Sequence, residues 1–119
     1  AMGLDIGFYC DGEEVFYLRN HDGLFEFFAD ANSGYVDDVY SDFYVTLGTL
    51  HLVEAKLEME FTCRGLVHSG ALTELPDEFH KMNAREEEWE QLLRYYPAIV
   101  ELLRLKIVAS GPLICSWSA

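Results

Sequence analysis

Three groups of residues in this sequence carry side chains that could do chemistry together. In the first, Arg19, His21 and Asp22 combine a guanidinium, an imidazole and a carboxylate within four positions of the chain. Such a cluster can bind a small anion or a charged group of a partner. The same side chains can also form a surface salt bridge and a helix cap, which are structural roles. We keep both interpretations and treat the three residues as a candidate binding corner.

A second group lies in an aromatic and acidic segment that we expect to be a loop. Its members are Tyr35, Asp37, Asp38, Tyr40 and Asp42. Carboxylates this close together suit a hard cation, but their spacing lacks the pattern of a calcium-binding loop. The sequence therefore predicts a solvated loop without a metal ion. Tyrosines beside acids also suit an interface with a basic protein.

The third group consists of cysteines and histidines in the least readable part of the chain. Cys63, His68 and His80 could in principle hold a metal ion, but they lack the paired spacing of structural zinc sites. The sequence contains no C-x-x-C pair, H-E-x-x-H motif, glycine-rich phosphate loop or G-x-S-x-G elbow. We therefore predict no catalytic residue, no metal and no cofactor, and we expect the protein not to be an enzyme.

A β-hairpin at the beginning of the chain has to position the first of these groups. Asp11-Gly12 lies between two runs of aromatic and β-branched residues, which is typical of a two-residue hairpin turn. With that turn, Phe8 should lie opposite Val15, and Ile6 opposite Tyr17.

Alternation of side chains along the strands then sorts the hairpin into two faces. The expected core face consists of Leu4, Ile6, Phe8, Cys10, Val15 and Tyr17. The other face is mixed, and Tyr9, Phe16 and Leu18 should form an apolar patch on it.

The middle of the chain predicts a helix, a strand and a second helix. The first helix should run from residue 23 to about residue 31, capped by Asn20 or Asp22. Residues 43–47 should form a strand, and Thr49 should cap a helix whose apolar side chains recur at helical spacing. These side chains are Leu50, Val53, Leu57 and Phe61.

A long helix and a final strand should complete the chain. Asn83 can cap the helix, with Glu86 as its capping-box partner. One apolar stripe continues from Trp89 to residue 103, and Pro97 inside it predicts a helix that is kinked or broken. Residues 113–117 should form the last strand.

These elements predict one α+β domain that spans residues 1–119. Four short strands and about three helices favour two layers with a mainly antiparallel sheet. Ala1 before Met2 is typical of a cloning remnant, and no segment predicts a signal peptide or a membrane span. Three widely spaced cysteines indicate reduced thiols and a cytoplasmic location.

The charge of the chain limits its partners. Eight basic and 21 acidic side chains give a net charge of −13, which would repel the phosphate backbone of a nucleic acid. We therefore expect no direct binding to nucleic acid or membrane, and a protein partner that is basic.

Several segments resemble small phage and prophage proteins that begin with an MGLD[IM] motif. The opening Met2-Gly3-Leu4-Asp5-Ile6 carries that motif, and residues 15–21 resemble the strand-to-helix junction of the group. Residues 89–103 and 114–118 resemble its late helix and its closing strand, whereas residues 62–82 differ. The resemblance implies a phage or bacterial setting and no particular activity.

Together these observations predict an accessory protein that binds another protein through an acidic surface, as an inhibitor or immunity protein does. Two alternatives remain open. One is a small metal-binding protein or enzyme that uses histidines and cysteines in loops. The other is a structural homo-oligomer, such as a homodimer, joined through the outer face of the hairpin.

Overall fold

The computed structural model describes residues 4–32, 42–66, 75 and 77–118. Its sheet contains strands β1 (Asp5–Cys10), β2 (Glu13–Leu18), β3 (Phe43–Val45) and β4 (Leu113–Ser118). The strands lie in the order β2-β1-β4-β3, and every neighbouring pair is antiparallel. The predicted α+β fold with a four-stranded antiparallel sheet is therefore confirmed.

The Asp11-Gly12 turn is where the sequence places it, but the register beyond it differs from the prediction. Both turn residues have positive φ, and Cys10 pairs with Glu13. The register then shifts, so that Phe8 lies opposite Phe16 and not opposite Val15. Val15 is the extra residue of a β-bulge.

The bulge exchanges the two faces of β2. Ile6 lies opposite Leu18, and Gly7 lies opposite Tyr17. Leu18 is therefore fully buried, and Phe16 packs against the core, whereas Tyr17 lies on the outer face. The predicted apolar patch of Tyr9, Phe16 and Leu18 is consequently wrong.

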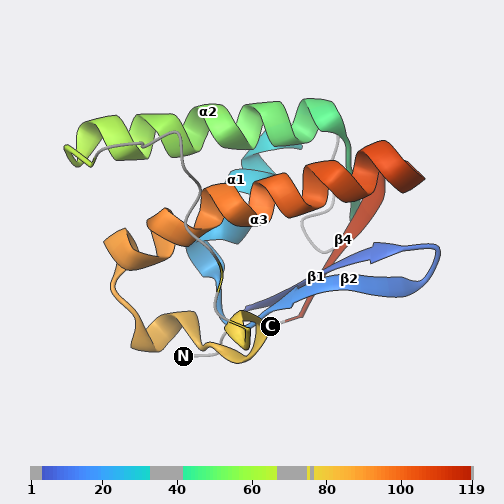
Figure 1. Ribbon diagram of the computed structural model, residues 1–119, viewed down its shortest axis with the longest axis horizontal. Helices are drawn as coiled ribbons and strands as arrows, with labels where there is room; N and C mark the ends of the chain where they lie inside the picture. The colour runs from blue at the N-terminus through green and yellow to red at the C-terminus, as the bar shows by residue number, and fades with distance from the viewer. Residues whose placement is uncertain (1–3, 33–41, 67–74, 76, 119) are drawn as a thin grey trace.

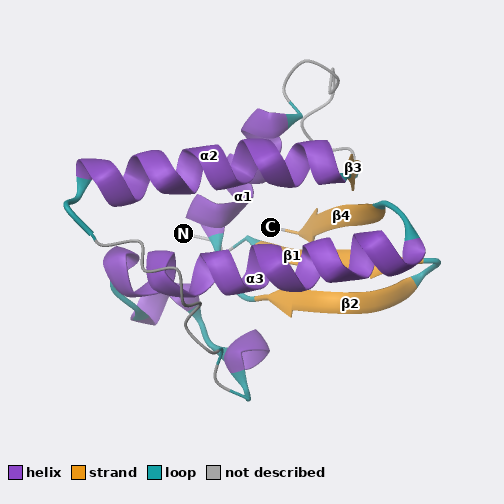
Figure 2. Cartoon of the chain, turned by 45° about the horizontal axis from the view of Figure 1, so that its top comes forward, coloured by secondary structure: helices purple, strands orange, loops and turns teal. Residues whose placement is uncertain are grey.

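In the described part of the chain, α-helices cover the inner face of the sheet (Figure 1). They are α1 (Asp22–Ala31), α2 (Leu47–Cys63) and α3 (Trp89–Ser110). Figure 2 shows from a second direction that α2 and α3 run alongside each other and that α3 lies in front of β1. Among the described residues, none of the helices is long and apolar enough to cross a membrane.

The caps of the first two helices differ from those predicted. His21 occupies the N-cap position of α1, and no side chain caps it. Helix α2 begins two residues before Thr49, and Thr46 is its N-cap. Thr46 and Thr49 exchange hydrogen bonds in a capping box, which satisfies amide groups at the helix terminus.

Helix α3 continues through Pro97 as a single helix, so the predicted break at this residue does not occur. Asn83 does not cap it, because its side chain accepts a hydrogen bond from the Arg85 amide and starts a short 3-10 helix, η2 (Ala84–Glu86). A second short helix, η1 (Phe79–Lys81), precedes η2. The predicted stripe is confirmed, since its aliphatic members and Tyr96 are buried.

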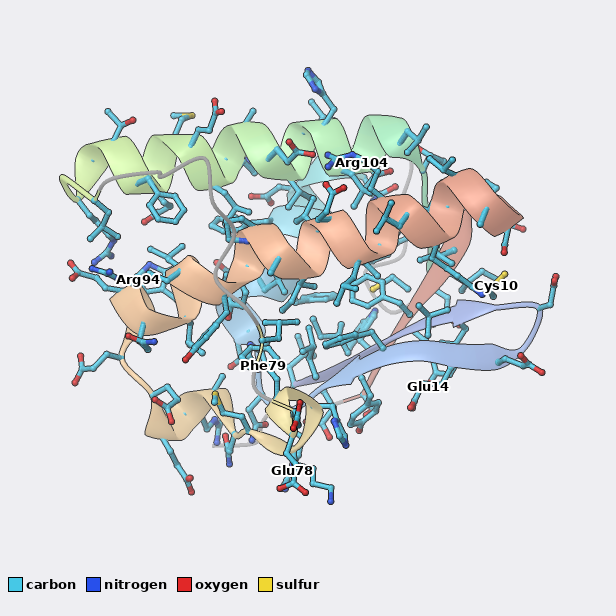
Figure 3. All side chains as sticks on the ribbon, in the orientation of Figure 1. Cys10, Glu14, Glu78, Phe79, Arg94 and Arg104 are labelled. Carbon is cyan, nitrogen blue, oxygen red and sulfur yellow. The ribbon has the colours of Figure 1, made fainter. Side chains whose placement is uncertain are left out.

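The core lies between the inner face of the sheet and the three helices. Phe8 of β1 packs on Phe28 of α1, with ring centroids 5.1 Å apart. The predicted apolar face of α2 is buried as well. Between α2 and α3, Arg104 forms ion pairs with Glu54 and Glu101 and thereby offsets part of the acidic charge there (Figure 3).

Candidate functional site

The junction between β2 and α1 is held by Asp5. One oxygen of Asp5 accepts a hydrogen bond from the Tyr17 hydroxyl at 2.6 Å, and the other accepts from the Asn20 amide at 3.1 Å. Asn20 has positive φ, which lets the chain turn sharply from the strand into the helix. The hydrogen bond to Asp5 is the main cause that raises the pKa of Tyr17 to about 12. Tyr17 is therefore a protonated donor at neutral pH.

His21 is buried at this junction, with 1% of its surface exposed. Its Nδ1 lies 2.8 Å from the Tyr96 hydroxyl of α3, and its ring contacts those of Phe79 and Tyr96. The imidazole thus connects the start of α1 to the middle of α3 and to η1.

The His21 ring is neutral at pH 7. Burial lowers its pKa to about 4, although the Met82 backbone and the Asp5 carboxylate favour the proton. Burial also raises the pKa of Tyr96, so its hydroxyl keeps its proton. Since that hydroxyl has no other acceptor in the described part of the chain, we assign it as the donor to Nδ1. The ring proton then lies on Nε2.

The other two residues of the predicted corner have separate roles. Asp22 accepts a hydrogen bond from the Leu4 amide at 3.2 Å, and its side chain does not cap α1. Arg19 is exposed, and its carbonyl accepts a hydrogen bond from the Ala84 amide. No ion pair joins Arg19 to a carboxylate within the described ranges. His21 and Asp22 line one cleft, whereas Arg19 is not among its lining residues.

Most of the predicted aromatic and acidic segment falls outside the described residues. These are Tyr35, Asp37, Asp38 and Tyr40. Asp42 is described, and it is exposed directly before β3.

The cysteine and histidine group is only partly described. Cys63 is exposed at the end of α2, His80 is exposed on η1, and His68 lies outside the described residues. Among the residues that the structure describes, no three histidine, cysteine or acidic side chains are placed to hold a metal ion.

The outer face of the sheet carries an aromatic surface. Ile114 of β4 pairs with Tyr9 of β1 on one side and with Tyr44 of β3 on the other. Tyr44 is 66% exposed and Ile114 39% exposed. Tyr17 lies opposite Gly7 on the same face, and the Tyr9 ring lies where a Cβ of Gly7 would be. We call Tyr9, Tyr17, Tyr44 and Ile114 the tyrosine face.

Acidic groups border the tyrosine face. None of the four strands contains a lysine or an arginine. Asp5 shares the face with Tyr17, and Glu14 of β2 pairs with Tyr9 and points away from the helices (Figure 3). Arg19, which follows β2, is the nearest basic residue along the chain.

Sequence reasoning missed both Tyr96 as the partner of His21 and the tyrosine face as a surface. His21 and Tyr96 are 75 positions apart in the sequence, so only the fold brings them into contact. A signal for the tyrosine face was present, since Tyr44 and Ile114 alternate with the inward-pointing residues of short strands.

Comparison of the chain with protein-family models, with curated proteins and with solved structures finds no match.

Proposed function

We propose that this protein binds another protein, and that the tyrosine face is its docking surface. The observation that carries the proposal is the row of Tyr9, Ile114 and Tyr44 across three strands, on the face of the sheet opposite the described helices. Tyrosine is enriched in protein interfaces because it offers a large apolar ring together with a polar group. A rigid sheet also holds such side chains in place before binding, which lowers the entropic cost of association.

The charge around the tyrosine face favours a basic partner. Lysine and arginine side chains can lie over tyrosine rings and pair with carboxylates such as Asp5 and Glu14. Asp5 is already fixed by two hydrogen bonds, so a partner does not have to order it. A second copy of this chain would instead bring like charges together. A basic nuclease toxin or a host DNA-binding enzyme has the required positive charge. In binding such a partner, the protein would act as an inhibitor or immunity protein.

An NMR titration tests the proposal with a defined probe. Isotope-labelled protein is titrated with a peptide rich in lysine and arginine, and with an acidic peptide of equal length. We expect the basic peptide to shift the amide signals of β1, β4 and β3 around Tyr9, Ile114 and Tyr44, and salt to weaken the effect. The acidic peptide should leave them unchanged.

Two variants provide the control. The pair Tyr44→Ser and Ile114→Ser should weaken binding of the basic peptide, whereas Leu52→Ser and Met59→Ser on exposed positions of α2 should not. Shifts that centre on α2 or α3 would contradict the proposal. So would self-association in light scattering that Tyr44→Ser abolishes, because a second copy would then be the occupant.

A further inference from the structure

Gly7 of β1 is covered by a side chain of its own strand. It belongs to the outer face of the sheet, because its neighbours Ile6 and Phe8 are both buried in the core, and yet Gly7 itself is buried. The cover is the Tyr9 ring, since a Cβ on Gly7 would lie 2.6 Å from Cε2, 2.7 Å from the hydroxyl oxygen and 2.9 Å from Cζ of that ring. Glycine thus allows the ring to lie back along β1.

The β-bulge determines which side chains border this ring. Glu14 lies opposite Tyr9, and after the bulge Tyr17 lies opposite Gly7. In a regular register, the alternation of side chains would place the apolar Phe16 on this face instead. Bulges are over-represented next to functional sites, where they re-aim a side chain. Here the bulge adds a hydroxyl beside the end of the ring that lies over Gly7, while the carboxylate lies beside its base.

Glu14 is the carboxylate that is left free for a partner. It is exposed and forms no ion pair with a basic residue of the described chain. Both oxygens of Asp5, by contrast, already accept hydrogen bonds, from the Tyr17 hydroxyl and the Asn20 amide. Because the Tyr17 hydroxyl donates its proton to Asp5, its oxygen can still accept a hydrogen bond from a partner. The ring is therefore bordered by two acceptors at separate points.

A planar cation with several donors suits this arrangement better than a compact one. An arginine guanidinium stacks on aromatic rings and carries five N–H donors in a fixed fork, so it can lie over Tyr9 and bond to both acceptors. A lysine ammonium is a point charge that is more strongly hydrated, so it gains less from the ring. Arg19, the nearest basic residue along the chain, forms no ion pair with Glu14. The free carboxylate therefore remains available to an arginine of a partner.

We propose that Tyr9, Glu14 and Tyr17 form a binding site for an arginine side chain, and that Gly7 determines its specificity. The guanidinium lies over the Tyr9 ring and donates hydrogen bonds to the Glu14 carboxylate and to the Tyr17 oxygen. This inference rests on the proposed docking role of the tyrosine face. It narrows the partner to a basic protein that presents an arginine, and not a lysine, at this point.

Two peptides of equal length and charge test the site, one with arginine and the other with lysine at every basic position. Calorimetry measures their affinities, and NMR of the labelled protein locates the surface that they bind. We expect the arginine peptide to bind about two- to fivefold more tightly, as an exposed cation–π contact allows, and to shift the amide signals of Tyr9 and Glu14 most. Equal affinity of two peptides that both bind the tyrosine face would overturn the arginine site and leave the docking surface standing. If neither peptide shifts this face, the proposed function fails as well.

The variant Gly7→Ala tests the site without removing any group that binds. The new Cβ would collide with the Tyr9 ring and displace it, so the preference for arginine should disappear while the lysine peptide binds as before. Gly7 is not among the residues with positive φ, so alanine does not strain the backbone. Circular dichroism checks that the variant is folded.

The variant Glu14→Gln should reduce the preference for arginine, and Glu13→Gln is its matched control. Both carboxylates are exposed on β2, but Glu13 lies opposite Cys10, one position further along, and therefore belongs to the other face. Each variant removes one charge, so only the position of the carboxylate differs. Retention of the arginine preference in Gly7→Ala, or equal effects of Glu13→Gln and Glu14→Gln, would overturn the proposal.

Discussion

At the scale of single residues, the clearest feature is a neutral histidine in the core. His21 is buried between Tyr96 and Phe79, and its Nδ1 lies 2.8 Å from the Tyr96 hydroxyl. An imidazolium there would lack solvent, which is why burial lowers the pKa of His21 from 6.5 to about 4.

Burial of His21 should make the stability of the protein depend on pH. Because the unfolded chain takes up a proton at His21 near pH 6.5 and the folded chain only near pH 4, stability falls as pH decreases through that window. The loss should reach about 3 kcal/mol in the free energy of unfolding. Urea denaturation at several pH values measures it. The variant His21→Gln should not show this loss of stability at low pH. The variant His51→Gln, at an exposed position of α2, should still show it. Equal pH dependence in the wild type and in His21→Gln would contradict the account.

The hydrogen bond from the Tyr96 hydroxyl to His21 should contribute to stability. Tyr96→Phe keeps the ring but leaves Nδ1 of His21 without its partner, so it should reduce the free energy of unfolding by about 1–3 kcal/mol. Tyr44→Phe, at a position that is 66% exposed, is the matched control and should change stability little. Chemical denaturation of both variants measures the two changes in the free energy of unfolding. A loss in Tyr96→Phe no larger than in Tyr44→Phe would show that the hydrogen bond contributes nothing.

At the scale of elements, the sequence predicts what depends on periodicity and misses what depends on a single residue. The apolar stripes of α2 and α3 repeat over several turns, so the pattern identifies them. The bulge at Val15 leaves no such pattern, because two registers of the hairpin look equally apolar. The helix caps were misplaced for a similar reason, since Thr46 and Thr49 are both good N-cap residues.

Deletion of Val15 tests the bulge. Without it, Phe8 still lies opposite Phe16 and Ile6 opposite Leu18, so the core should remain intact. The cost should be about 1–2 kcal/mol, from the lost packing of a half-buried valine. In a regular hairpin without a bulge, the same deletion would move Leu18 to the other face and unfold the protein. Circular dichroism and urea denaturation distinguish a folded variant from an unfolded one.

At the scale of the whole molecule, charge and aromatic side chains are distributed unevenly. Four of the eight basic residues form ion pairs on the helices or at their ends. These are Lys56, Arg64, Lys81 and Arg104. The strands contain no basic residue, and their outer face carries the tyrosines. This asymmetry supports the proposal that a basic protein binds to the outer face of the sheet.

Site-specific photo-crosslinking in cells tests this central claim most directly. Tyr44 and Met59 are both 66% exposed, but one lies on the tyrosine face and the other on α2. With a photoreactive residue at each position in turn, the account predicts a cross-linked protein of net positive charge from position 44 and none from position 59. Mass spectrometry identifies the protein, and added salt should reduce the yield. No product from position 44, equal products from both positions, or an acidic partner would contradict the account.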